Sequence, residues 1–117
     1  PDMVGHTGNI PAAIKAIETI DSCIGKICPL AKENGAGIFL TADHGNLEQM
    51  IDPATDKIHT AHTTLPVPLI VDCPNNRTYK LEKFGKLADI APTILDFLKI
   101  PIPSEMTGKT LLLHDND

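Results

Sequence analysis

A short, continuously apolar segment that runs into an acidic residue and a histidine places the strongest constraint on the fold. Residues 37–42 read Gly-Ile-Phe-Leu-Thr-Ala, without alternation of polar and apolar positions. This pattern is typical of a β-strand that is covered on both faces, as in the sheets of α/β proteins. Asp43 and His44 follow directly, and open α/β sheets bind ligands at this carboxyl end of their strands. The segment therefore predicts an α/β fold with a polar site at one edge of the sheet.

A long amphipathic segment precedes this strand. Isoleucine and alanine recur at spacings of three and four from Ile10 to Ile27, which is the period of one helix face. Asn9 is suited to cap this helix at its start. Pro29 lacks a backbone N–H, so we expect the helix to kink or end near Ile27. Any last turn is expected to stop at the Asn-Gly pair of residues 34–35.

The rest of the chain combines short strands with a second helix. Residues 67–71 and 111–113 are apolar and predict strands, the first at a sheet edge or strand start because it contains a proline. Apolar residues at helical spacing predict a helix over residues 87–98. Two or three strands do not complete an α/β sheet, so the strand edges and apolar helix faces are expected to need further neighbours.

Charge, hydropathy and cysteine content exclude several classes of protein. The 117 residues carry a formal net charge of -5 and no basic run, which argues against nucleic-acid binding. No apolar stretch reaches the roughly 20 residues that cross a bilayer, so no membrane partner is expected. Three cysteines without a Cys-x-x-Cys spacing are typical of reduced thiols in the cytosol. We therefore expect a cytoplasmic protein.

Acidic residues and histidines gather in three polar stretches. The residues concerned are Asp2, His6, Asp43, His44, His59 and His62. Asp2 and His6 would share a face if they lay on a helix, although the glycines nearby favour a turn. Taken singly, each residue is also explained as a helix cap, a strand-end turn or a solvated surface histidine. Together, carboxylates and imidazoles in three stretches predict a site for one or two divalent ions such as Mn²⁺, Zn²⁺ or Mg²⁺.

Five strings of the chain closely resemble those of the cofactor-independent phosphoglycerate mutases, a family of the alkaline phosphatase superfamily. Three of them are Pro-Asp-Met-Val-Gly-His-Thr-Gly at residues 1–8, Thr-Ala-Asp-His-Gly-Asn at 41–46 and His-Thr-Ala-His-Thr-Thr at 59–64. The others are Leu-Ala-Asp-Ile-Ala-Pro-Thr-Ile-Leu at 87–95 and Met-Thr-Gly-Lys at 106–109. The strings follow the order and spacing of that family over nearly the whole chain.

The resemblance implies a fold, a domain arrangement and a reaction. The family's phosphatase-like domain is a sandwich of helices around a mixed, mostly parallel sheet, split in sequence by an inserted substrate domain. Residues 1–117 would form the C-terminal segment of that metal-binding domain, without the nucleophile segment or the inserted domain. The implied reaction interconverts 3-phosphoglycerate and 2-phosphoglycerate through a phosphoserine, in glycolysis and gluconeogenesis. The substrate is therefore a small molecule, and the full-length enzyme is expected to be a monomer.

The resemblance also implies the ligands of two Mn²⁺ ions, which Mg²⁺ or Co²⁺ replaces in some members. Asp2, His6 and His62 would hold one ion. Asp43 and His44 would hold part of the other.

His59 matches no ligand position of the family and is expected to be structural. No string of the chain matches the family's nucleophilic serine, so no catalytic residue is assigned and the chain alone is expected to be inactive. Two alternatives stay open. One is another metal-dependent phosphoryl enzyme of the same superfamily, such as a phosphopentomutase or a phosphatase. The other is a truncated, non-catalytic chain that only binds metal.

Overall fold

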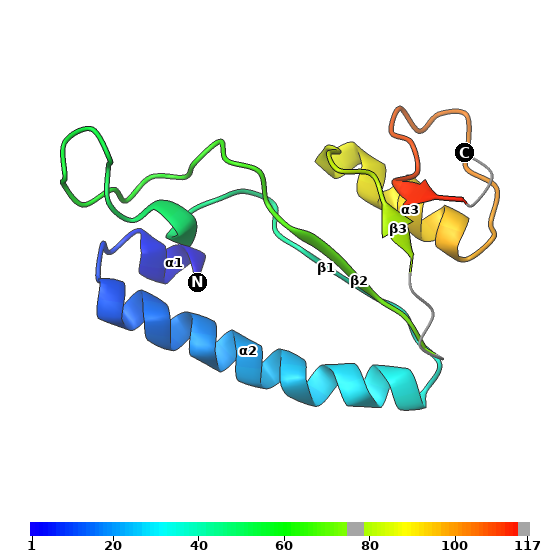
Figure 1. Cartoon of the computed structure of the whole chain (residues 1–117), viewed down its shortest axis with the longest axis horizontal. Helices are drawn as coiled ribbons and strands as arrows, with labels where there is room; N and C mark the ends of the chain where they lie inside the picture. Colours follow the sequence, from blue (N-terminus) through cyan, green and yellow to red (C-terminus); the bar gives the residue numbers. More distant parts are fainter. Residues whose placement is uncertain (75–78, 115–117) are drawn as a thin grey trace.

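The computed structural model describes residues 1–74 and 79–114 as a mixture of helices and short strands (Figure 1). A long helix runs along one side, and a two-stranded ribbon extends from its far end back toward the N-terminus. The helices are α1 (Asp2–Gly5), α2 (Ile10–Glu33) and α3 (Ile90–Phe97), and short 3₁₀ turns lie at η1 (Leu47–Gln49) and η3 (Leu87–Asp89). The strands are β1 (Ile38–Thr41), β2 (Leu69–Asp72), β3 (Lys80–Leu81) and β4 (Leu112–Leu113).

Both ends of α2 are capped by the residues that the sequence indicated. The side-chain oxygen of Asn9 accepts a hydrogen bond from the backbone N–H of Ala12 at 3.1 Å. At the other end, the side chain of Asn34 donates to the carbonyl of Leu30 at 2.8 Å. Gly35 follows with a φ of 68°, a conformation that glycine adopts without strain. These contacts fix where the chain enters and leaves the helix.

The helix does not end near Ile27, which was one of the two outcomes predicted for Pro29, and its stop at the Asn-Gly pair of residues 34–35 is confirmed. It continues through Pro29 to Glu33. Proline removes one hydrogen bond, here to the carbonyl of Gly25 four residues earlier. Gly25 and Pro29 are both exposed, so water can satisfy the freed carbonyl. The free-energy cost of the lost hydrogen bond is therefore small enough for α2, which is capped at both ends, to continue past Pro29.

The segment that contains Asp2 and His6 is a helix rather than the expected turn. The single helical turn α1 places these two residues, four apart, on the same face. Gly5 makes this turn possible, because a Cβ at that position would overlap the side chain of Asn46. Gly8, with a φ of 67°, then reverses the chain into α2.

The strands pair in two antiparallel ribbons. β1 pairs with β2, with Ile38 opposite Asp72 and Thr41 opposite Leu69, and β3 pairs with β4. Within the described residues both pairs are antiparallel, and β1 is half-buried instead of covered on both faces as its sequence predicted. Few elements of this chain are available to cover it: Phe97 of α3 packs edge-on against Phe39, with ring centroids 5.4 Å apart.

The most closely packed part of the chain surrounds α3. Thr93 is fully buried, and its hydroxyl donates to the carbonyl of Asp89 at 2.6 Å and accepts from the N–H of Leu111 at 3.0 Å. The carboxylate of Asp89 accepts the backbone N–H groups of Lys86 and Lys109, each at 2.9 Å. These bonds fasten the segment before β4 to the start of α3.

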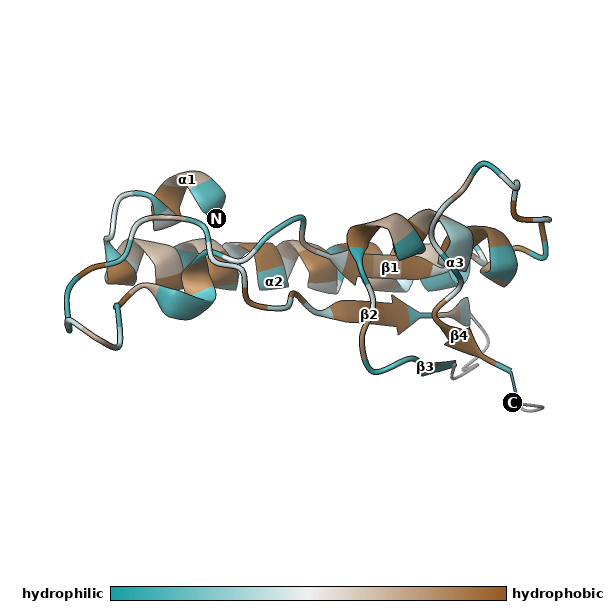
Figure 2. Cartoon of the chain, turned by 90° about the horizontal axis from the view of Figure 1, so that it is seen from above, coloured by the Kyte–Doolittle hydropathy of each residue, from teal (hydrophilic) through white to brown (hydrophobic). Residues whose placement is uncertain are grey.

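The chain is more open than a compact domain of its length. Its radius of gyration is 17.0 Å, against about 13 Å for a compact domain of this size. The predicted apolar face of α2 exists but stays largely exposed, with exposed fractions of 56% for Ile14 and 57% for Ile27. Figure 2 shows apolar positions along α2 and over both strands of the β1–β2 ribbon. None of the helices in residues 1–74 and 79–114 has the length and apolar character needed to cross a membrane.

Candidate metal centre

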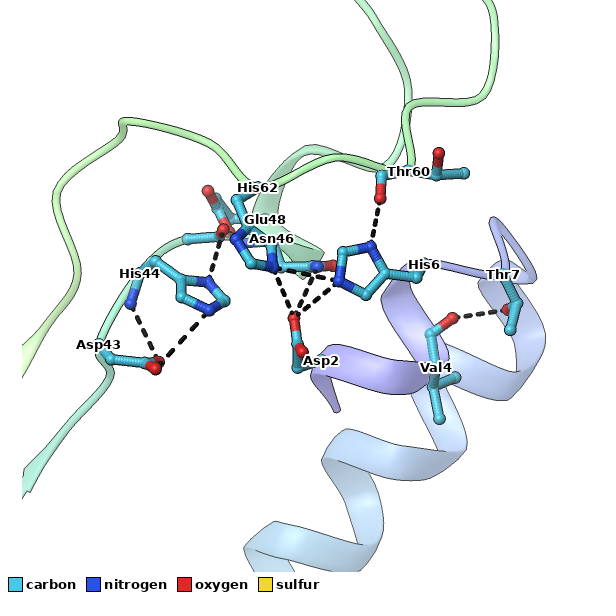
Figure 3. A network of polar contacts seen from close by, with 11 residues as sticks. Asp2, Val4, His6, Thr7, Asp43, His44, Asn46, Glu48, Thr60 and His62 are labelled. Carbon is cyan, nitrogen blue, oxygen red and sulfur yellow. Dashed lines mark hydrogen bonds and ion pairs between the residues drawn. The ribbon is translucent and has the colours of Figure 1, made fainter.

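Three side chains from distant parts of the sequence meet beside α1 (Figure 3). Asp2 begins α1, His6 follows its last residue, and His62 comes from the loop after η1. The Asp2 Oδ1 atom lies 3.0 Å from His62 Nε2 and 3.3 Å from His6 Nε2. The two Nε2 atoms are 3.1 Å apart. Three Lewis-basic atoms at such distances can share one cation, or one proton in its place.

A backbone contact determines which nitrogen of His6 faces this cluster. The Nδ1 atom of His6 lies 2.6 Å from the carbonyl oxygen of Thr60. A carbonyl can only accept, so Nδ1 carries the hydrogen and donates it. In the neutral ring, Nε2 then presents its lone pair to Asp2 and His62. Metal-binding histidines commonly donate their other ring N–H to a backbone carbonyl in this way.

The carboxylate of Asp2 is ionised and held in place by its neighbours. Burial raises its pKa, but the charge of His6 and the hydrogen bond from His62 outweigh this effect, and the pKa lies below its ordinary value. The amide of Asn46 donates to the same oxygen at 3.2 Å, and Asn46 itself is buried. Asp2 therefore offers a negative charge of defined orientation at neutral pH.

A second pair of donors lies next to the cluster, at the carboxyl end of β1. His44 Nε2 is 3.7 Å from Asp43 Oδ2, and His44 Nδ1 contacts the carbonyl of Gly45 at 3.3 Å. The ring of His44 stacks on the ring of His62, with centroids 3.6 Å apart and planes at 20°. The two donor groups are therefore in direct contact through their imidazoles.

A cavity of about 400 Å³ lies beside the donors. Its lining includes Asp2, Asp43 and His44 together with Ile17 and Ile20 of α2. The cavity is large enough for a small anion and its hydration water next to the donors. Its charged residues are acidic, so an anionic ligand would need a cation between itself and this wall.

The spacing of the donors fits a divalent ion. Ligand atoms about 2.1 Å from a metal ion lie about 3.0 Å apart at right angles and about 3.4 Å apart at tetrahedral angles. The three separations among Asp2, His6 and His62 are 3.0, 3.1 and 3.3 Å. One carboxylate and two imidazoles, one of them with a backbone-fixed tautomer, are a donor set that Mn²⁺, Zn²⁺ or Co²⁺ accepts. Asp43 and His44 add two further donors beside it.

The structure brings together the residues that the sequence singled out and reveals two that it missed. Asp2, His6 and His62 form one cluster, with Asp43 and His44 alongside, whereas His59 is not a member of the cluster. The missed residues are Asn46, which contacts Asp2, and Glu48, which contacts the loop of His62. Asn46 closes the family-like string at residues 41–46, and Glu48 lies four residues after His44, but neither position indicates a contact with the donors.

This arrangement, with carboxylates and imidazoles at the end of a strand in a mixed α/β structure, is that of a metal-dependent enzyme. The model of the metalloenzyme superfamily matches residues 1–102, and the chain belongs to this family. Membership implies a divalent metal ion as the class of cofactor.

Within the family, the chain is similar to phosphoglycerate mutases. It is 54% identical over 112 residues to the 2,3-bisphosphoglycerate-independent phosphoglycerate mutase of Clostridioides difficile (strain 630), which covers 96% of this chain and 22% of the relative. It is also 54% identical over 114 residues to 2,3-bisphosphoglycerate-independent phosphoglycerate mutase 2 of Methanosarcina barkeri, covering 97% of this chain and 21% of the relative.

A solved structure has the same fold. The chain superposes with a TM-score of 0.84 and 25% identity on a phosphoglycerate mutase of Leishmania mexicana, crystallised at low cobalt concentration. The match covers 97% of this chain and 23% of that one. The resemblance and the alkaline-phosphatase-like fold predicted from the sequence are thereby confirmed. The chain spans about a fifth of the length of the relatives that it matches.

Proposed function

We propose that this chain is the C-terminal, metal-binding segment of a 2,3-bisphosphoglycerate-independent phosphoglycerate mutase. That enzyme would interconvert 3-phosphoglycerate and 2-phosphoglycerate in glycolysis and gluconeogenesis, as a cytoplasmic monomer. The observation that carries the proposal is the meeting of Asp2, His6 and His62 from positions up to 60 residues apart. Identity of 54% to enzymes of that name over nearly the whole chain supports the same conclusion.

In this proposal, Asp2, His6 and His62 hold one ion, and Asp43 and His44 hold part of a second. Mn²⁺ is the expected metal, with Mg²⁺ or Co²⁺ as substitutes. A divalent ion bound there supplies charge that polarises a phosphoryl oxygen and offsets the charge of the phosphate.

Other residues of the chain hold the proposed metal ligands in position. His6 keeps a fixed tautomer through Thr60, and Asn46 holds the carboxylate of Asp2. Asp2 and Asp43 in the wall of the cavity would repel a phosphate, and a bound divalent ion would offset their charge. No residue of this chain is assigned as the nucleophile, so the chain alone is expected to bind metal and not to convert phosphoglycerate.

A chimeric enzyme tests this proposal. The matching 112-residue segment of the Clostridioides difficile enzyme is replaced by this chain, and conversion of 3-phosphoglycerate is followed in a coupled assay with Mn²⁺. We expect the chimera to be active. His62→Ala in the chimera should lower both the activity, by about 100-fold or more, and the metal content. The substitution removes a proposed metal ligand and its contacts with Asp2 and His6.

His59→Gln is the matched control, because His59 belongs to the same loop but not to the donor cluster. It should leave the activity within a few-fold of the parent chimera. A chimera that folds and binds Mn²⁺ but does not convert 3-phosphoglycerate would overturn the assignment. Activity on a phosphopentose instead would favour the phosphopentomutase alternative.

A further inference from the structure

The two loops that carry His44 and His62 meet at a small number of contacts. Gly45 and Thr63 form an isolated antiparallel bridge, in which the N–H of Thr63 donates to the carbonyl of Gly45 at 2.9 Å. Gly45 directly follows His44, and Thr63 directly follows His62. The position of this bridge therefore determines how the two imidazoles face each other.

The carboxylate of Glu48 reaches both loops from η1. Its Oε2 atom accepts the backbone N–H of Asn46 at 2.6 Å, and its Oε1 atom accepts the hydroxyl of Thr63. The hydrogen bond from Thr63 is the main cause that holds the pKa of Glu48 below its ordinary value. Although the residue as a whole is exposed, both of its oxygens are engaged. Figure 3 shows Glu48 beside Asn46 and His62.

The backbone beneath this contact has no room for a side chain. A Cβ at Gly45 would overlap both the Glu48 carboxylate and the Thr63 hydroxyl. Gly45 is buried, and a side chain there would have to displace the Glu48 carboxylate or the Thr63 hydroxyl from their mutual contact. The small size of Gly45 is therefore compatible with a carboxylate that lies across the two loops.

Residues on either side of the Gly45–Thr63 bridge contact the donor cluster. His44 stacks on His62 at 3.6 Å, and the side chain of Asn46 donates to Asp2. Both oxygens of Glu48 already accept a hydrogen bond, one from each loop, and Glu48 is not a member of the cluster of Asp2, His6 and His62. Its influence on the metal centre must therefore pass through the residues that it holds.

We propose that Glu48 is a positioning residue, whose carboxylate fastens the loop of His44 to the loop of His62 and so sets the geometry of the donor cluster. This inference rests on the metal centre of the proposed function. Outer partners of metal ligands contribute about 10- to 100-fold to metal affinity, and we expect the loss of Glu48 to fall in that range.

The test is a Co²⁺ titration of the purified 117-residue chain by calorimetry, with the visible absorption of the bound Co²⁺ as a report of its coordination. Glu48→Ala should weaken Co²⁺ binding at least 10-fold and alter the absorption spectrum. Glu48→Gln should restore binding to within a few-fold, because its oxygen can accept from Asn46 and its amide can donate to the Thr63 hydroxyl. Glu18→Ala, which removes an exposed carboxylate of α2 that pairs with Lys15, is the matched control and should bind as the parent does.

The outcomes separate this inference from the proposed function. A parent chain that binds no Co²⁺ would overturn the metal centre and the positioning role together. A parent that binds Co²⁺, with an equal affinity and spectrum in Glu48→Ala, would overturn the positioning role alone. If circular dichroism shows that Glu48→Ala does not fold, Thr63→Val decides the matter, since it replaces the hydroxyl by a methyl group of similar size and leaves the Glu48 carboxylate in place. Unchanged Co²⁺ binding in Thr63→Val would then overturn the proposal.

Discussion

Replacing Asp89 by Asn should destabilise the packed region around α3. Asp89 is 2% exposed, and each of its carboxylate oxygens accepts one backbone N–H, from Lys86 and from Lys109, at 2.9 Å. A hydrogen bond to a charged group contributes about 2 kcal/mol, and a neutral one about 1 kcal/mol. Asparagine keeps a single acceptor oxygen and turns an N–H donor toward the other backbone N–H. The loss therefore amounts to about 3 kcal/mol.

The chain contains its own probe for this measurement. Tyr79 is its single tyrosine, there is no tryptophan, and the Tyr79 ring packs against Phe97 of α3 at 5.5 Å. Urea unfolding followed by tyrosine fluorescence at pH 7 should show a midpoint lower by about 1–2 M in Asp89→Asn. Asp21→Asn, which changes an exposed carboxylate of α2, should leave the midpoint unchanged. A shift below about 0.3 M in Asp89→Asn would refute the reasoning, since it corresponds to less than one ordinary hydrogen bond.

The difference in stability between the parent and Asp89→Asn should depend on pH. The hydrogen bonds from Lys109 and Lys86 hold the pKa of Asp89 below its ordinary value despite burial. A carboxyl whose pKa is lowered in the folded state stabilises that state. The contribution is fully present above the pKa of the unfolded chain, about 3.9, and is lost as the pH falls through the pKa of the folded state. The difference between the parent and Asp89→Asn should therefore be constant above about pH 4 and shrink below it. A difference that persists unchanged in strong acid would show that the charge of Asp89 is not its cause.

Three further predictions concern the backbone, the metal and the surface. Gly108→Ala should cost about 2 kcal/mol of stability by urea unfolding, because a Cβ there would press on the carbonyl of Ala88; Gly25→Ala, where a Cβ meets only open space, should cost nothing. The affinity for Mn²⁺ should fall as the pH is lowered, since imidazoles must be neutral to bind metal, and a flat affinity down to about pH 5 would argue against histidine ligation. The chain should associate through the exposed isoleucines of α2, so a monomer at every concentration in sedimentation velocity would contradict that expectation.

Local sequence patterns predicted where elements begin and end better than how they are covered. Asn9 and the Asn-Gly pair at 34–35 marked the ends of α2 because capping depends on only a few neighbouring residues. Pro29 did not end the helix, because the cost of a proline depends on whether water can reach the freed carbonyl, and exposure is known only from the structure. The half-burial of β1 also escaped prediction, because burial depends on what packs against the strand.

The candidate site was predictable as a set of residues but not as a geometry. Asp2 and His6 lie on a turn of α-helix instead of the expected non-helical turn, because the absence of a side chain at Gly5 lets this segment pack against Asn46. Such a close approach between residues 41 apart leaves no local pattern. The roles of Asn46 and Glu48 were invisible for the same reason, since their partners lie in other segments.

The distance along the chain between Asp2 and His62 has a consequence for folding. These two residues lie 60 positions apart, and an ion that both bind closes the intervening chain into a ring. A covalent cross-link over a span of this length lowers the conformational entropy of the unfolded chain, which stabilises the folded state by about 4 kcal/mol. An ion here would act as a reversible cross-link between α1 and the loop of His62. The supply of metal in the cell would then control how much of this segment is ordered as well as whether it is ready for chemistry.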